Sequence, residues 1–220
     1  MSDFDFNIII ESIPFLLEGM GLTLLLTFFA IVGGLALGVV LALCRLSPYG
    51  WLSFAAATYV NFFRSMPLIL IIFWFYFLVP FILGRPVGGF YSVLIAFVMF
   101  EAAYYCEIMR AGIQSVRTGQ VYAGQALGLT YKQNMQFVVL PQAFRAMMPI
   151  LLTQAIILFQ DTSLVYVVGL RDFLVAADIV ANRDNRLMEM YLTVALVYFV
   201  LCLMGQLCIN KLQKKYPSGR

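Results

Sequence analysis

Polar side chains lie inside long apolar stretches of this sequence, and their types fit the binding of a charged solute. Glu101 lies in the third apolar run, and Gln154 and Gln160-Asp161-Thr162-Ser163 lie in the fourth. Asp161 is ten residues from Arg171, or about 15 Å along a helix, near the middle of a hydrocarbon layer of roughly 30 Å. Acids at such depth face protein or water and predict a functional site. The predicted substrate-binding residues are Glu101, Gln154, Gln160, Asp161, Thr162 and Ser163.

Each of these residues also has a structural interpretation. Glu101 is equally well explained as a buried carboxyl bonded to a neighbouring tyrosine. The cluster from Gln160 to Ser163 is also explained by hydrogen bonds between helices, although a hydrated cavity is favoured. The polar residues alone leave both alternatives open.

Several chemistries are excluded by the residues that the chain does not contain. There is no histidine, which removes the usual general base and the commonest metal ligand. The four cysteines form no CxxC pair, and no lysine directly follows a glycine, as a phosphate-binding P-loop requires. The sequence therefore predicts no enzyme activity, no bound metal and no cofactor, and any ATP and Mg²⁺ would be bound by another polypeptide.

The composition predicts an all-α protein that lies in a membrane. Apolar residues make up 63% of the 220 residues and charged residues 11%, whereas soluble domains have roughly 45–50% and 25%. Long apolar runs are separated by charged segments and predict five spanning helices in one domain, residues 1–220. The runs lie between Glu18 and Arg45, Arg64 and Arg85, Val87 and Met109, Arg145 and Arg171, and Glu189 and Lys211.

The basic residues predict the orientation of the chain. If the C-terminus is cytoplasmic, only Arg85, Arg171, Arg183 and Arg186 of the 14 lysines and arginines lie outside. This bias follows the positive-inside rule and places the N-terminus outside and the C-terminus inside. The first run is long enough to span, and the segment before it is acidic, so we expect an uncleaved helix. No basic face with interleaved aromatic residues predicts nucleic-acid binding.

Two patterns inside the spans predict packing. Small residues recur every four positions in the first run, which predicts a close helix neighbour in this chain or in a second subunit. In the third run, Glu107 and Arg110 are three residues apart and are expected to form a structural ion pair. The small residues are Ala30, Gly34, Gly38 and Ala42.

A polar interruption, residues 119–141, separates the third and fourth runs. It contains small residues, a central Gly128 and a terminal Pro141, a layout that suits a compact loop held by another protein. Within it, Ala123 to Pro141 resembles the cytoplasmic EAA loop of ABC importer permeases. The family pattern is Glu-Ala-Ala, three residues, Gly, nine residues and Ile-x-Leu-Pro. Here Tyr122 replaces the glutamate and Gly124 the second alanine, while the spacing is kept.

Other segments resemble the polar amino acid subfamily of these permeases, and the resemblance covers nearly the whole chain. Those most similar to glutamate/aspartate permeases are Phe100–Tyr105 and Leu158–Tyr166. The wider set is Phe63–Leu68, Tyr105–Ser115, Leu140–Arg145 and Asp161–Leu164.

The resemblance implies a multi-pass subunit of a bacterial inner-membrane importer that works by alternating access. Its partners would be a cytoplasmic ABC ATPase dimer, a periplasmic amino-acid-binding protein and a second permease, either a sister chain or a copy of this one. The loop would dock on the ATPase, with Gly128 taking a special backbone conformation, small residues allowing close approach and Pro141 separating the loop from the next span. The implied coupling residues are Ala123, Gly124, Ala126, Leu127, Gly128 and Pro141.

Two other classes compete with this interpretation. In an ion-coupled secondary transporter, Glu101 and Asp161 would serve as ion or proton sites, although five spans are few and no inverted repeat is visible. A purely structural membrane subunit would need no polar cluster at the middle of the membrane.

Overall fold

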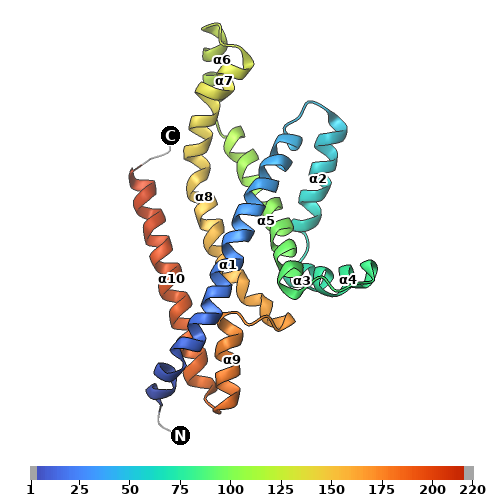
Figure 1. Cartoon of the computed structure of the whole chain (residues 1–220). Coiled ribbons are helices and arrows are strands. Elements are labelled where there is room, and N and C mark those ends of the chain that lie inside the picture. The colour runs from blue at the N-terminus through green and yellow to red at the C-terminus, as the bar shows by residue number, and fades with distance from the viewer. Residues whose placement is uncertain (1–3, 216–220) are drawn as a thin grey trace. The chain divides into compact units, whose positions relative to one another are not determined.

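A computed structural model describes residues 4–215 of the 220 (Figure 1). The described residues form helices joined by short connections and contain no strand, which confirms the all-α prediction. Two segments are π-helical, η1 (Trp74–Leu78) and η2 (Met135–Val139), and η3 (Thr162–Val168) is a 3-10 helix. The α-helices are α1 (Phe6–Arg45), α2 (Gly50–Arg64), α3 (Leu68–Phe73), α4 (Val79–Leu83), α5 (Gly89–Gln114), α6 (Thr118–Ala126), α7 (Tyr131–Asn134), α8 (Leu140–Asp161), α9 (Phe173–Arg183) and α10 (Leu187–Lys215).

Four helical segments of the described chain are long and apolar enough to cross a membrane, and a fifth is counted if α2 and the helix Leu68–Leu83 together form one span. The four are Phe6–Arg45, Gly89–Gln114, Tyr131–Val168 and Leu187–Lys214.

The predicted second span is therefore shorter than expected. The helix Leu68–Leu83 follows Pro67, which caps it in an extended conformation. It ends at Gly84, whose φ of 65° is left-handed. Sixteen residues reach about 24 Å, less than the roughly 30 Å of the hydrocarbon layer, so this helix does not span alone.

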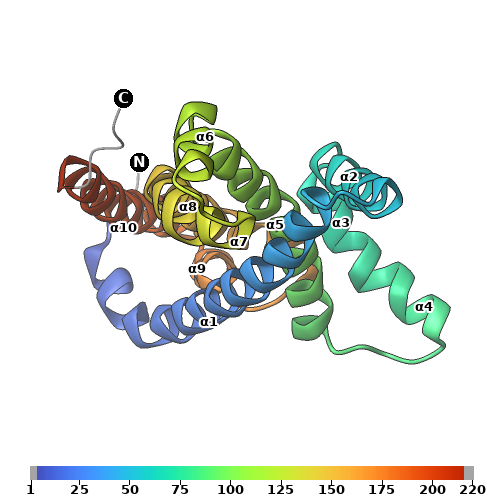
Figure 2. The same ribbon diagram turned by 90° about the horizontal axis from the view of Figure 1, so that it is seen from above.

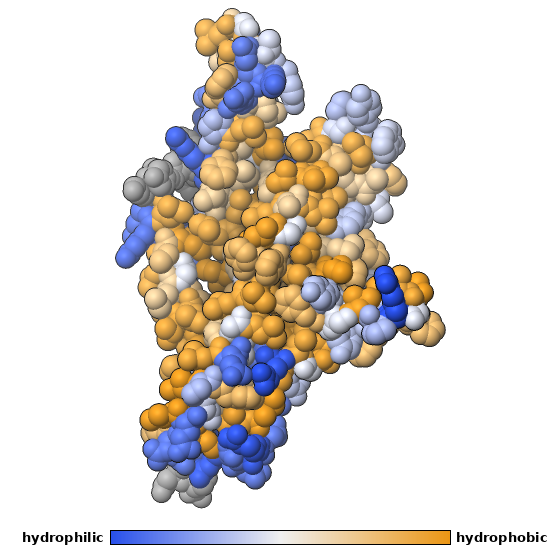
Figure 3. Space-filling model, viewed as in Figure 1, coloured by the Kyte–Doolittle hydropathy of each residue, from blue (hydrophilic) through white to orange (hydrophobic). Residues whose placement is uncertain are grey.

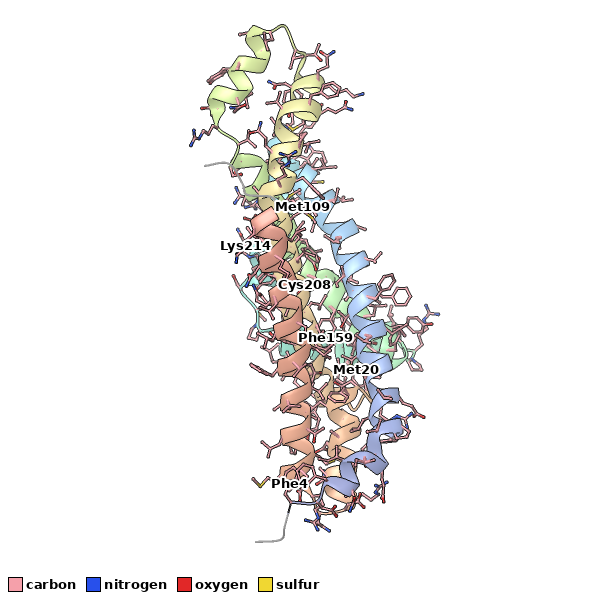
Figure 4. The ribbon with its side chains drawn as sticks, turned by 90° about the vertical axis from the view of Figure 1, so that its left-hand side faces the viewer. Phe4, Met20, Met109, Phe159, Cys208 and Lys214 are labelled. Atoms are coloured by element: carbon pink, nitrogen blue, oxygen red, sulfur yellow. The ribbon has the colours of Figure 1, made fainter. Side chains whose placement is uncertain are left out.

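The chain forms two compact units, each assembled from three separate segments. Residues 4–32, 67–98 and 155–206 form the first unit, and residues 33–66, 99–154 and 207–215 form the second. Figure 4 labels Met20 and Phe159 in the first unit and Met109, Cys208 and Lys214 in the second. Because the segments alternate along the sequence, no single cut in the chain separates the units.

The core of the first unit lies where α9 packs against the first part of α1 and against α10. Small residues on α9, including Ala176 and Ala177, allow the helices to approach closely. Gly19 of α1 is needed for the same reason, because a Cβ there would lie 2.5 Å from the carbonyl oxygen of Asp172. The buried residues are Leu16, Phe173, Ala176, Ala177, Val180, Ala181, Met190 and Val194.

In the second unit, the last part of α1 packs on α5. A Cβ at Gly34 would lie 2.9 Å from the Cβ of Glu101, and one at Gly38 would lie 2.8 Å from the Cβ of Tyr105. The small residues therefore let the two backbones come close. The predicted close neighbour is a helix of this same chain.

Candidate translocation and coupling sites

Glu101 and Gln154 lie together in the second unit. Glu101 of α5 is completely buried, and its two carboxylate oxygens accept hydrogen bonds from Nε2 of Gln154 at 3.2 and 3.1 Å. The buried carboxylate thus has an amide donor, as a buried polar group requires. The side-chain partner of Glu101 on α8 is therefore the amide of Gln154.

The other four predicted residues, Gln160 to Ser163, lie in the first unit at the junction of α8 and η3. Thr162 Oγ1 donates to the carbonyl oxygen of Phe159 at 2.6 Å, and Ser163 Oγ donates to that of Gln160 at 2.8 Å. Both hydroxyl protons are therefore used locally, and the hydroxyl oxygens can still accept a bond from a donor.

Asp161 differs from its neighbours. It is half-buried at the last position of α8, and within residues 4–215 its carboxylate forms no hydrogen bond or ion pair. The helix changes here from α to 3-10 geometry, as often happens where an α-helix comes to its end. An acid in this state within a membrane-length helix is suited to bind a cation or an ammonium group.

The interruption between the third and fourth runs folds into two short helices, α6 and α7, beyond the start of α8 (Figures 1 and 2). The turn between them is a Schellman motif, in which the N–H of Gly128 bonds the carbonyl of Gln125 at 2.9 Å and that of Leu129 bonds Gly124 at 3.1 Å. Gly128 has a φ of 79°, which only glycine adopts without strain. The prediction of a special conformation at Gly128 is confirmed.

A capping box begins α7. The side chain of Thr130 accepts a bond from the N–H of Gln133, and Gln133 Oε1 accepts one from the N–H of Thr130 at 2.9 Å. The spacing Thr-x-x-Gln is a known helix-start signal and could have predicted this helix from the sequence. The sequence reasoning did not use it.

The helices α6 and α7, with the turn between them, are called the docking element. Pro141 does not separate this element from the following helix, contrary to the prediction. Helical residues run from Tyr131 through Pro141 to Asp161. Proline is tolerated near the start of an α-helix, where its missing N–H causes little loss. The π-helical turn η2 just before it uses wider bonds, including Leu140 N–H to the carbonyl of Met135, so the helix passes through this region without a break.

The α6–α7 element presents large apolar side chains to solvent. Leu127 is 82% exposed and Tyr131 78% exposed, and Tyr122, which stands where the family pattern has glutamate, is 66% exposed. The surface of this region mixes hydrophobic and hydrophilic residues (Figure 3). Of the predicted coupling residues, Ala123, Ala126, Leu127, Gly128 and Pro141 are exposed and Gly124 is buried. Exposed apolar groups on a folded element indicate a contact surface.

The predicted pair of Glu107 and Arg110 is part of a larger ion cluster in the second unit. Arg110 Nη2 lies 2.7 Å from the Glu107 carboxylate, Arg45 Nη2 lies 3.1 Å from it and Arg64 Nη1 lies 3.9 Å from it. Arg64 also lies over the ring of Tyr104, 5.5 Å from its centroid. The sequence predicts that all three arginines lie on the same side of the membrane, but nothing in it indicates that Arg45 and Arg64 contact Glu107.

Residues 34–216 match the protein family described as "Binding-protein-dependent transport system inner membrane component". This chain belongs to that family.

Two groups of relatives agree with this assignment. The chain is 47% identical to the glutamate/aspartate import permease protein GltK of Escherichia coli O157:H7, with 98% of this chain and 99% of the relative covered. It is 34% identical to the arginine transport system permease protein ArtQ of Bacillus subtilis, with 98% of each covered.

Solved structures share the fold. One described as the crystal structure of an amino acid ABC transporter with histidines aligns with a TM-score of 0.91 and 30% identity, covering 96% of this chain and 98% of the other. An inward-facing MetNI methionine ABC transporter aligns with a TM-score of 0.70 at 21% identity, over the full length of both chains, and shows the fold alone.

Membership of this family confirms four predictions: the ABC importer permease resemblance, the permease fold, a transport subunit in place of an enzyme, and a multi-pass inner-membrane location. The family transports by way of a binding protein, so the ion-coupled secondary transporter is not retained. The substrate and coupling roles of the individual residues stay predictions.

Proposed function

We propose that this chain is the membrane permease subunit of an ATP-driven importer of polar amino acids, with glutamate and aspartate as its substrates. The similarity to GltK supports the acidic substrates, because this identity of 47% exceeds the 34% to ArtQ, which is named for arginine. The chain itself binds no nucleotide. ATP and Mg²⁺ are bound by a cytoplasmic ATPase dimer, and a periplasmic amino-acid-binding protein delivers the substrate.

The observation that carries this function is the α6–α7 element with Leu127 at its tip. Its helix ends are closed by local hydrogen bonds, so the element is folded without a partner. A leucine that is 82% exposed on such an element is suited to enter an apolar groove, and an ATPase surface beneath the membrane supplies that partner. Movement of the ATPase would then shift this element as a rigid body and switch access to the substrate.

The ion pairs support the proposed orientation. Arg45, Arg64 and Arg110, all predicted to lie inside, gather around Glu107. In the first unit, Arg171 and Glu18, both predicted to lie outside, form an ion pair at 3.0 Å. These pairs join residues predicted to share a side, and the positive-inside bias then assigns the N-terminus to the outside and the C-terminus to the inside, with α6 and α7 in the cytoplasm beside the ATPase in the proposed complex.

The substrate roles follow from which polar atoms remain available. The carboxylate of Asp161 binds the substrate's ammonium group. Gln160, Thr162 and Ser163 contact its carboxylates, Gln160 through its amide donors. In the second unit, Glu101 and Gln154 form a buried pair that holds α5 against α8. A second permease, a sister chain or a copy of this one, completes the translocation path.

Uptake of radiolabelled glutamate, aspartate, glutamine and arginine in cells lacking this gene tests the function. Wild type and two variants that add one negative charge to the docking element are returned to the cells: Leu127→Glu at the tip, and Gln120→Glu at the exposed start of α6 as the matched control. We expect glutamate and aspartate uptake to be lost on deletion and restored by wild type and by Gln120→Glu. Leu127→Glu should restore less than about a tenth, because a charge cannot enter an apolar groove without its full desolvation cost.

Two outcomes would contradict the proposal. Loss of glutamine or arginine uptake alone would remove the acidic substrates. Full restoration by Leu127→Glu, with the variant present in the membrane at wild-type level, would show that the tip of the α6–α7 element is not the ATPase contact.

A further inference from the structure

Asn134 is a buried polar residue at the end of α7, between the two helices of the docking element. Only 3% of its surface is exposed. Its side-chain Nδ2 donates a hydrogen bond to the carbonyl oxygen of Val121 at 2.8 Å, so it joins α7 to the middle of α6. The two helices follow each other in the chain (Figure 1), and the turn between them contains Gly128.

The same side chain explains why position 124 is a glycine. A Cβ at Gly124 would overlap Oδ1 of Asn134 and would lie 2.9 Å from its Cγ. Gly124 is also buried and lies inside α6, where glycine is less favourable than alanine. The family pattern has alanine at this position, so the glycine accommodates the asparagine.

We infer that Asn134 is the positioning residue of the docking element and that Gly124 is its required partner. The amide spans the space between α6 and α7 that two alanine-sized residues would leave open, and it fixes the angle at which Leu127 and Tyr131 are presented. The contact between Asn134 and Val121 is uncharged, and Tyr122 occupies the position of the family's glutamate. In this chain the angle between α6 and α7 is therefore fixed without that acid. The inference rests on the proposed coupling role of the loop.

A double-mutant cycle tests the contact. Gly124→Ala, Asn134→Ala and the double variant are compared in the full transporter, reconstituted with its ATPase and binding protein in lipid vesicles. Gly124→Ala alone should force the amide out of its place. In the double variant the new methyl group meets no amide, so the double variant should behave like Asn134→Ala alone.

The first readout is independent of the ATPase. Trypsin cleaves after Lys132, which is exposed in the first turn of α7, only when α7 opens locally. In vesicles that hold the permease alone, we expect cleavage in Gly124→Ala to be about tenfold faster than in wild type, as a local opening becomes more populated. Asn134→Ala should be intermediate, and the double variant should match it.

The second readout is glutamate transported per ATP hydrolysed in the full complex. If the contact is merely structural, less ATPase is bound and this ratio is unchanged. If the contact positions the element, the ratio falls in Gly124→Ala and returns in the double variant to the value of Asn134→Ala. If the double variant is cleaved as fast as Gly124→Ala, the inference is wrong. If cleavage follows the cycle while the transport ratio stays at the wild-type value in all variants, the contact exists but the positioning role is wrong, and the coupling role of the loop is decided separately by Leu127→Glu.

Discussion

Replacing Glu107 by glutamine is expected to destabilise the protein strongly, because this carboxylate forms ion pairs with three guanidinium groups. Arg110, Arg45 and Arg64 lie 2.7, 3.1 and 3.9 Å from the Glu107 carboxylate, whose side chain is 15% exposed. Glutamine has nearly the same shape, so the change removes charge and leaves volume almost unaltered. The three arginines then repel each other in a poorly hydrated place.

The size of the effect follows from burial. Removing one partner of a buried ion pair costs about 3–5 kcal/mol. Because the side chain of Arg64 is 43% exposed, we take the lower end, about 3 kcal/mol. With the unfolding entropy per residue of soluble domains, 1 kcal/mol corresponds to about 2–4 °C in a chain of this size, so the melting temperature should fall by about 6–12 °C.

Glu18→Gln is the matched control. Glu18 also forms an ion pair, with Arg171 at 3.0 Å, but the two side chains are 62% and 53% exposed. Such surface pairs contribute about 0–1 kcal/mol, and the melting temperature should fall by less than about 4 °C. Both variants are measured in lipid nanodiscs by the loss of the assembled complex on heating, followed by fluorescence-detected size exclusion. Equal shifts for the two variants would refute the reasoning that burial makes the Glu107 cluster important.

Two further predictions concern packing and capping. Gly38→Ala should lower stability by about 1–3 kcal/mol through overpacking, because the new Cβ would lie 2.8 Å from that of Tyr105. A Cβ at Gly21 meets nothing within 4 Å, so the control Gly21→Ala should raise stability by up to about 1 kcal/mol. Shifts of the melting temperature in the same direction for both variants would refute this. Burial raises the pKa of Asp172 from 3.8 to about 6, while hydrogen bonds such as that from Val175 N–H oppose the rise. A raised pKa in the folded state means that stability is lost as pH rises from about 4 to 6, by about 3 kcal/mol. Asp172→Asn keeps the capping oxygen and should remove this loss. Melting temperatures of the two proteins that fall in parallel from pH 4 to 7.5 would contradict the prediction.

Much of this fold could be predicted from composition, because a membrane-spanning helix needs little beyond a long apolar run. The helices around Glu101 and Asp161 were predicted in this way, and the glycines at positions 34 and 38 predicted a close helix neighbour. The helix after Pro67 is shorter than its charge-free run, because charge-free length says nothing of where Pro67 starts a helix and Gly84 ends it. Joined with α2, it still counts as a fifth span.

The candidate sites were harder to predict, because their contacts join residues that are distant in sequence. Nothing near Gln154 indicates that its amide meets the carboxylate of Glu101, since that contact depends on how α8 packs on α5. Asn134 resembles any other polar residue of a loop until its burial and its bond to Val121 are seen. Short-range signals were more informative, since the conformation of Gly128 follows from its place after α6.

The two candidate sites differ in how their polar groups are satisfied, and this difference suits their proposed roles. In the α6–α7 element the helix ends are closed by the Schellman turn at Gly128 and the capping box at Thr130. Such an element is ordered before it meets a partner, so docking requires little further loss of conformational freedom. The helix that begins with α7 continues from Tyr131 to Asp161. At the other end of that helix, Asp161 has a carboxylate with no bonded partner within residues 4–215. A pre-ordered contact surface in the second unit and an unsatisfied acid in the first unit therefore suit two different proposed roles, the docking of an ATPase and the binding of a solute.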